Sequence, residues 1–179
     1  TDGTEAGTVR VKDINPGGFS SSPTSLTAFG NSVYFFADDG VHGIELWTSD
    51  GTDGGTQLVK DIRVGTSGQS PRGIAISNGN LLFYGNSGTS GTTGLWKSSG
   101  AIGNATFVTT VPGSIVWQVQ AFQNRIYYTD QGGYLYVSSG DVGNQSTVQS
   151  FNSTINKFVN ANGALYFNRP GNAGAGLYR

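Results

Sequence analysis

ELWTSDGTDGGTQLVKDI, residues 45–62, is the stretch that decides the fold predicted from this sequence. An apolar and aromatic run ending in Leu46 and Trp47 leads into a Ser-Asp-Gly-Thr turn, and residues 58–62 then alternate as a strand does. Asp-Gly turns between two such runs are typical of β-hairpins. The stretch is therefore predicted to be a hairpin, and the rest of the chain repeats it with changes in spacing.

Four copies of the turn occur in register, about 48, 49 and 40 residues apart, at residues 1–4, 49–52, 98–101 and 138–141. A leucine followed by an aromatic residue precedes the later turns and occurs again near residue 179: Leu46-Trp47, Leu95-Trp96, Leu135-Tyr136 and Leu177-Tyr178. We expect one domain, residues 1–179, made of four repeats at about 1–48, 49–97, 98–137 and 138–179.

Each repeat contains four predicted strands in the same order. The strand after the turn falls at residues 9–14, 57–62, 107–111 and 147–151. A short apolar strand follows, at residues 26–29, 74–76, 119–122 and 157–159. A tight polar turn leads to an aromatic strand, at residues 33–36, 81–84, 126–128 and 165–167, and the leucine-aromatic strand completes the unit. Four strands per repeat of this length predict an all-β fold, a β-propeller of four four-stranded blades, alone or within a larger propeller or repeat array.

The two ends of the chain belong to the same predicted blade. Leu177-Tyr178-Arg179 followed by residues 1–4 would reproduce residues 46–52 without a gap. We therefore expect residues 9–14 to pair beside the strand that ends at Tyr178 and to close the last blade, which removes an exposed sheet edge. A window cut from a longer array would show the same register, so the join does not fix the number of blades.

The composition narrows the classes of function. With 29 Gly and only 12% charged residues, the chain favours short strands and tight turns over helices. Cys is absent, which excludes disulfides, thiolate catalysis and zinc–thiolate sites. The net charge is −1 without a basic patch, and no apolar run reaches the length of a membrane span. We expect no nucleic-acid partner, no membrane insertion and no cofactor.

Residues 45–52, with Gly55-Thr56 and residues 59–62 after them, resemble the bacterial ELWxxDGT-repeat family. The likeness covers about the first 100 residues, because repeats three and four keep the spacing but lose the Glu, the Trp and the Asp-Gly-Thr. This resemblance implies a propeller-like repeat protein that is secreted or displayed on the bacterial cell surface. The richness in Gly, Ser, Thr, Asn and aromatic residues agrees with that location.

The carboxylates of the turns are interpreted as structural. Asp2 and Asp50 stand where a carboxylate accepts hydrogen bonds from the backbone of its own turn, and one or two carboxylates do not supply the six to eight oxygens of a calcium site. Asp38 and Asp39, with Glu45 nearby, form the densest acidic cluster but lack the spacing of a calcium loop. We expect no metal site.

Catalytic residues are not apparent. His42 is the only histidine and no nucleophile motif accompanies it. Glycosidic hydrolysis needs two carboxylates facing each other, and the later repeats contribute only Asp130 and Asp141. The sequons at Asn104, Asn144 and Asn152 are chance products of composition in a bacterial protein and acceptors in a eukaryotic secretory one.

Two sets of equivalent positions receive opposite interpretations. One set is aromatic in every repeat and is predicted to pack blade against blade: Trp47, Trp96, Tyr136 and Tyr178. The other set precedes the inner strand of each repeat and varies in side chain: Thr24, Arg72, Trp117 and Asn156. Variation at a position that the fold repeats marks a candidate ligand site at the propeller mouth, with Trp117 as a stacking residue or, alternatively, as a plug of the channel.

The sequence therefore predicts a non-catalytic, extracellular or cell-surface propeller module. Its partner would be a glycan or a protein surface, further repeats, or another copy in adhesion or assembly. The alternative is a polysaccharide-directed enzyme domain with its site at the same mouth.

Overall fold

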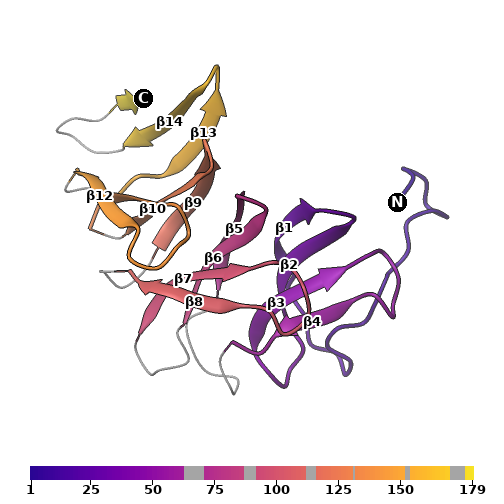
Figure 1. Ribbon diagram of the computed structural model, residues 1–179. Coiled ribbons are helices and arrows are strands. Elements are labelled where there is room, and N and C mark those ends of the chain that lie inside the picture. The colour runs from indigo at the N-terminus through magenta and orange to yellow at the C-terminus, as the bar shows by residue number, and fades with distance from the viewer. Residues whose placement is uncertain (63–70, 87–91, 112–115, 131, 152–153, 170–175) are drawn as a thin grey trace.

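The computed structural model of the chain is all-β (Figure 1). It describes residues 1–179 except 63–70, 87–91, 112–115, 131, 152–153 and 170–175. The side chains of Val116 and Trp117 are also outside the described part. The described residues form four antiparallel sheets. Within this part of the chain no helix is long and apolar enough to span a bilayer.

Consecutive strands build each sheet. Sheet 1 contains β1 (Thr24–Phe29), β2 (Ser32–Asp38), β3 (Ile44–Ser49) and β4 (Gln57–Lys60). Sheet 2 contains β5 (Arg72–Ser77), β6 (Asn80–Asn86), β7 (Thr93–Ser98) and β8 (Thr106–Thr110). Sheet 3 contains β9 (Val116–Phe122), β10 (Arg125–Asp130), β11 (Tyr134–Ser138) and β12 (Gln145–Ser150). Sheet 4 contains β13 (Lys157–Ala161), β14 (Ala164–Arg169) and β15 (Gly176–Tyr178).

The recurring strand order agrees with the repeat predicted from the sequence, and the all-β, propeller-like architecture is confirmed. Every ladder joins strands that are neighbours in the sequence, as hairpin turns require. Asn78, Gln123, Asn124 and Asn162 adopt positive φ in the turns between the first and second strands of their sheets, where the sequence places Asn or Gln beside Gly or Asn.

The sheets follow one another in chain order as a row of stacked layers (Figure 1). The first strands of adjacent sheets adjoin each other, β1 beside β5, β5 beside β9 and β9 beside β13. The N-terminus lies at the sheet 1 end of this row and the C-terminus at the sheet 4 end. The first strands therefore lie together along one side of the row, and β1, β5, β9 and β13 are called the inner strands here.

Alternate side chains of each strand face the two neighbouring sheets. In β6, Leu81 and Phe83 pack against sheet 1, whereas Leu82 and Tyr84 pack against sheet 3. The same alternation places Leu165 and Phe167 of β14 against sheet 3. The core thus has three apolar layers, one between each pair of adjacent sheets, and a fourth, smaller cluster lies on the outer face of sheet 1.

One predicted pairing is not present in the described structure. Residues 9–14 form no strand, and β15 pairs with β14 on one side only, so sheet 4 has three described strands. Residues 9–14 lie instead along sheet 1, where Ile14 packs with Phe35, Trp47 and Leu58. The physical reason is the apolar outer face of sheet 1, which gives Ile14 a place to bury its side chain.

Candidate functional site

The four predicted site positions lie at the starts of the inner strands. Thr24 and Arg72 are the first residues of β1 and β5, Trp117 is the second residue of β9, and Asn156 directly precedes β13. Because these strands adjoin in order and each repeat faces its neighbours in the same way, the four positions lie along one side of the row, where the inner strands start. This side is called the mouth here. Thr24 and Asn156 are exposed and Arg72 is half-buried, while the side chain of Trp117 lies outside the described part.

A β-bulge occurs at the mouth end of three sheets. The register shifts between Thr24 and Thr27 in β1 and between Arg72 and Ile74 in β5, and a shift opposite Asp130 falls next to Trp117. Such bulges turn side chains out of the regular ladder. The repeat pattern of the sequence does not predict these bulges, although the glycine of the Arg72-Gly73 pair is a signal for one of them.

Gly73 shows why the second sheet needs its bulge glycine. Its φ is +61°, a conformation that L side chains rarely adopt. A Cβ at this position would lie 2.7 Å from Cγ2 of Val119, so the inner strands of sheets 2 and 3 approach closely there. Arg72 is thus held beside a tight contact between two sheets.

Antiparallel pairing puts the loop between the second and third strands of a sheet at the end where the first strand starts, so the sequence repeat predicts residues 38–43 and 85–93 at the mouth. The loop between β2 and β3 borders it. The backbone N–H of Asp38 donates to the carbonyl of Ser21 at 2.9 Å, three residues before Thr24. The corresponding loop predicted at residues 85–93 lies partly outside the described residues. One rim of the mouth is therefore built by the turn that carries His42.

His42 and Asp39 form an ion pair in this loop, with 2.6 Å between Nδ1 and Oδ2. Asp39 also accepts the backbone N–H groups of Val41 and His42 at 2.9 and 2.8 Å. Burial raises the pKa of Asp39, but these donors outweigh it and hold the pKa below its ordinary value. The hydrogen bond that His42 donates to the Asp39 carboxylate raises the pKa of His42. The pair braces its own turn.

Other carboxylates near the mouth also serve as local acceptors. Asp38 accepts the N–H of Gly40 at 2.7 Å, and buried Glu45 accepts the N–H of Ile62 at 3.0 Å. Asp130, also buried, accepts the N–H of Tyr134 at 2.9 Å and the hydroxyl of Tyr136 at 3.0 Å. Among the described residues no group of three His, Asp or Glu side chains could hold a metal ion.

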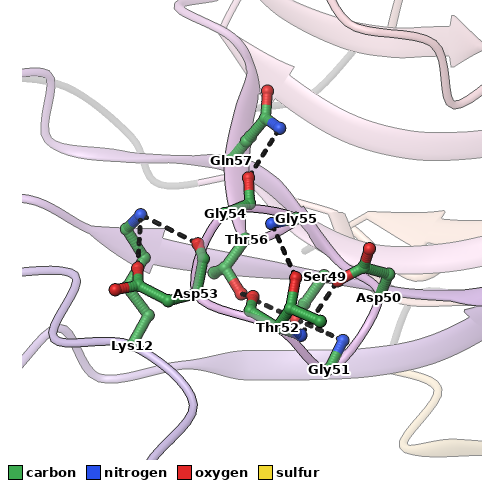
Figure 2. A network of polar contacts seen from close by, with 10 residues as sticks. All are labelled: Lys12, Ser49, Asp50, Gly51, Thr52, Asp53, Gly54, Gly55, Thr56 and Gln57. Atoms are coloured by element: carbon green, nitrogen blue, oxygen red, sulfur yellow. Dashed lines mark hydrogen bonds and ion pairs between the residues drawn. The ribbon is translucent and has the colours of Figure 1, made fainter.

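The turn between β3 and β4, residues 49–56, is called the Asp turn here (Figure 2). It lies at the end of sheet 1 away from the mouth, because β3 starts beside the mouth loop and ends at this turn. Oδ1 of Asp50 accepts the backbone N–H and the hydroxyl of Thr52 at 2.9 and 2.7 Å. Asp2 makes the same two bonds to Thr4, also at 2.9 and 2.7 Å. These donors lower the pKa of both carboxylates, the hydroxyl most. The structural interpretation of the two aspartates is confirmed.

Three of the four repeated aromatic residues pack between sheets, as predicted. Trp96 stacks on Phe83 with 6.4 Å between ring centroids, within the layer shared by sheets 1 and 2. Tyr136 stacks on Tyr128 at 5.2 Å between sheets 2 and 3. Tyr178 stacks on a ring of sheet 4 next to sheet 3. Trp47 is buried too, although no sheet precedes it, because the N-terminal segment covers it.

Two apolar grooves mark the outer faces of the row. A groove of about 440 Å³ on sheet 1 is lined by Leu26, Val33 and Phe35 together with residues of the N-terminal segment. A groove of about 670 Å³ on sheet 4 is lined by Val159, Leu177 and others, including Asn156. Periodicity in the sequence does not predict these grooves, because it shows which side chains face a neighbouring sheet but not whether a neighbouring sheet is present.

Comparisons with known proteins support the fold. No family model and no curated protein matches the chain. A chain of the nidogen/laminin complex superposes with a TM-score of 0.59 at 15% identity, over 83% of this chain and 56% of that one. The computationally designed Ika4 protein gives 0.61 at 16% identity over 96% of both chains, and designed Ika8 gives 0.57 at 18% over 89% of this chain and 46% of its own.

Likeness at these identities shows the fold alone, which is β-propeller-like. The chain spans about half the length of the nidogen/laminin chain and of Ika8, and the full length of Ika4. The four sheets of this chain therefore superpose on the whole of Ika4 and on part of the two longer chains.

Proposed function

We propose that the chain is a non-catalytic binding module whose ligand contacts lie at the mouth, at Thr24, Arg72, Trp117 and Asn156. The observation that carries the proposal is the equivalence of these positions at the starts of four adjoining strands, in a framework that otherwise repeats. The described side chains among them, those of Thr24, Arg72 and Asn156, offer a hydroxyl, a guanidinium and an amide at the mouth. Such groups hydrogen-bond and stack on glycans and on protein surfaces.

The proposed absence of catalysis is supported by the mouth carboxylates. A general acid of a polysaccharide-directed enzyme needs a carboxyl whose pKa is raised, and a second carboxylate facing it. Asp39 has a lowered pKa and is paired with His42, and Asp130 accepts two hydrogen bonds from sheet 3. Their roles as local acceptors favour binding over the enzymatic alternative.

The proposal also includes a location outside the cell and a relation to the ELWxxDGT-repeat family. The ELWxxDGT resemblance of residues 45–62 supports a secreted or cell-surface protein, where adhesion to glycans or proteins is a common task. A similar fold takes part in the nidogen/laminin complex, which is consistent with a propeller-like surface used for protein binding. Glycan and protein surface thus share one proposed site.

A glycan array probed in parallel with immobilised extracellular proteins tests this function. The variants are Trp117→Ala and Arg72→Ala, and Arg125→Ala is the matched control because Arg125 is exposed at the opposite end of the inner strands, paired with Phe122. We expect to find a ligand for which both mouth variants have an affinity about tenfold lower or more than the parent, as substitutions of hot-spot residues do. The control variant should bind this ligand as tightly as the parent. Equal binding by all variants, or hydrolysis of an arrayed polysaccharide, would overturn the proposal.

A further inference from the structure

The outer faces of sheets 1 and 4 are built like faces that pack against another sheet. The leucine before the aromatic position is buried in three sheets, at 0%, 2% and 4% exposure for Leu46, Leu95 and Leu135. Leu177 occupies the same position in sheet 4 and is 74% exposed. Its neighbour on that face, Val159, is 46% exposed. Sheet 4 therefore presents the surface that sheets 1 to 3 use to receive the following sheet.

Sheet 1 presents the complementary surface. Val33 and Phe35 of β2 are equivalent to Leu81 and Phe83 of β6, which pack against the preceding sheet. Val33 is 37% exposed, and Leu26 beside it is 67% exposed. Exposed apolar area of this extent on one face is a signature of an interaction site. The two outer faces thus correspond to the two sides of one sheet-to-sheet contact.

The N-terminal segment already lies on sheet 1 as the fourth strand of a preceding sheet would. Nζ of Lys60 in β4 donates to the carbonyl of Ala105 in the turn region of sheet 2, at 2.9 Å. Lys12 is the equivalent residue, and its Nζ donates to the carbonyl of Asp53 in the Asp turn of sheet 1, at 3.1 Å (Figure 2). Residues 9–14, VRVKDI, also match residues 57–62, QLVKDI, in sequence.

The hydrophobic contacts agree with this equivalence. Ile62 follows β4 and is buried in the layer between sheets 1 and 2. Ile14 stands at the same place in its segment and packs on Phe35 and Trp47 of sheet 1. The turn before the segment is already folded, since the hydroxyls of Thr1 and Thr8 are 2.7 Å apart, as those of Ser49 and Thr56 are at 2.8 Å. The missing part is the three strands that such a fourth strand would join.

Sheet 4 is a three-stranded sheet in the part of the chain that the structure describes, and no other described strand pairs with β15 beyond β14. In sheet 1, Trp47 pairs with Leu58, and Thr48 pairs with Gln57. The same register would pair Tyr178 with Arg10 and Arg179 with Val9. An open edge beside an apolar face is a ready template for strand addition.

We propose that a second copy of this chain occupies both faces. Sheet 4 of each copy stacks on sheet 1 of the other, and residues 9–12 of each copy add the fourth strand to sheet 4 of the other. Two equivalent head-to-tail contacts then close a ring of eight sheets. The match to Ika8 covers 46% of that chain, so a four-sheet row can form part of a longer arrangement of this fold. The opposite positions of the two termini in Figure 1 favour closure between copies over closure within one.

This association also completes the mouth. A single row offers the four mouth positions along one side, whereas the ring would place the mouths of two copies around one axis. The inference stands on the outer faces and on residues 9–14, so it does not depend on which ligand the mouth binds. Failure of the glycan and protein screens would leave it intact.

Light scattering during size-exclusion chromatography tests the association. The expected mass is about twice the 18.7 kDa of one chain. Leu177→Asp is expected to reduce it to one chain with the β-sheet circular dichroism retained. Val142→Asp is the matched control and keeps the doubled mass, because Val142 is 81% exposed in a turn of sheet 3. A parent mass of one chain, or a mass that grows without limit with concentration, would overturn the two-copy ring.

Disulfide trapping separates closure between copies from closure within one chain. The chain has no Cys, so Val9→Cys and Arg179→Cys can be introduced as the only thiols, at positions that the proposed register makes neighbours. We expect the two single variants, refolded together and oxidised, to give a covalent dimer containing one of each. Val142→Cys refolded with Arg179→Cys should give none. A double variant that forms only an internal bond, or no bond at all, contradicts the proposal.

Discussion

The two middle sheets and the two end sheets differ in what covers their faces, although their sequences share one pattern. Sheets 2 and 3 have a neighbouring sheet on both sides, and their leucine-aromatic strands are buried. Among the described residues, the N-terminal segment is what covers the outer face of sheet 1, and Leu177 on sheet 4 is exposed. The same residue type at the same position therefore contributes to stability only where a neighbour is present, as in other repeat proteins.

The two tryptophans give the largest test of this difference. Trp96→Ala removes a ring packed between Phe83 and Phe107, so we expect a loss of about 3 to 5 kcal/mol in the free energy of unfolding. Trp47→Ala is expected to cost about 3 kcal/mol, the lower end of that range, because a single segment covers it. Chemical denaturation measures both. A larger loss at Trp47 would show that the N-terminal segment packs as tightly as a sheet.

The leucine position gives the next largest effect. Leu95→Ala should cost about 2 to 5 kcal/mol at any protein concentration, since Leu95 is buried within the chain. Leu177→Ala should change stability by about 0.5 kcal/mol or less in dilute protein, as exposed substitutions do. If two copies associate, its cost rises with protein concentration by mass action. Denaturation at two concentrations a hundredfold apart distinguishes these outcomes, and a constant large loss at Leu177 contradicts the exposure seen here.

Two stacked tyrosines in the layer between sheets 2 and 3 provide a finer comparison. Burial raises the pKa of Tyr136 to about 12, and its hydroxyl donates to buried Asp130. Burial also raises the pKa of Tyr128, whose hydroxyl has no hydrogen-bond partner among the described residues. Tyr136→Phe should therefore cost about 1 to 3 kcal/mol, whereas Tyr128→Phe should be neutral or slightly stabilising. Thermal melts of the two variants measure these losses. A larger loss for Tyr128→Phe than for Tyr136→Phe would show that the Tyr128 hydroxyl makes a hydrogen bond.

The smallest expected effect is the pH dependence of the His42–Asp39 pair. The folded pKa of His42 is raised, so its contribution is fully present below the unfolded pKa near 6.5 and is lost as pH rises through the folded pKa. The gain is limited to about 1 kcal/mol because the His42 side chain is 37% exposed. Parent and His42→Gln should thus differ most near pH 5 and least near pH 9. A difference that is constant across this range would show that His42 stays neutral.

The sequence predicted the strands and turns better than it predicted which sheet each segment packs against. Alternation and turn residues placed every observed strand, and the Asp-Gly-Thr pattern predicted the hydrogen bonds of Asp50. These features are local, since the residues that decide them lie within a few positions of each other. The fate of residues 9–14 depends on which sheet lies beside them, and no local pattern contains that information.

The candidate site was predictable to the same degree. Repeat alignment placed Thr24, Arg72 and Asn156 at the starts of the inner strands, because the repeat fixes backbone position. It did not predict the bulges next to Thr24 and Arg72, since a bulge depends on how closely two inner strands approach. The contact between Gly73 and Val119 shows that such an approach is set by a neighbouring repeat.

The pairing of sequence neighbours in every ladder has a consequence for how the chain folds. Each hairpin closes only a short loop, so the entropy lost before the first contacts form is small. The Asp turn adds a nucleus in which all the bonds of Asp50 and Thr52 fall within residues 49–56. A sheet can therefore begin to form on the ribosome as soon as its last strand has emerged, and the docking of sheet on sheet becomes the slow step of folding.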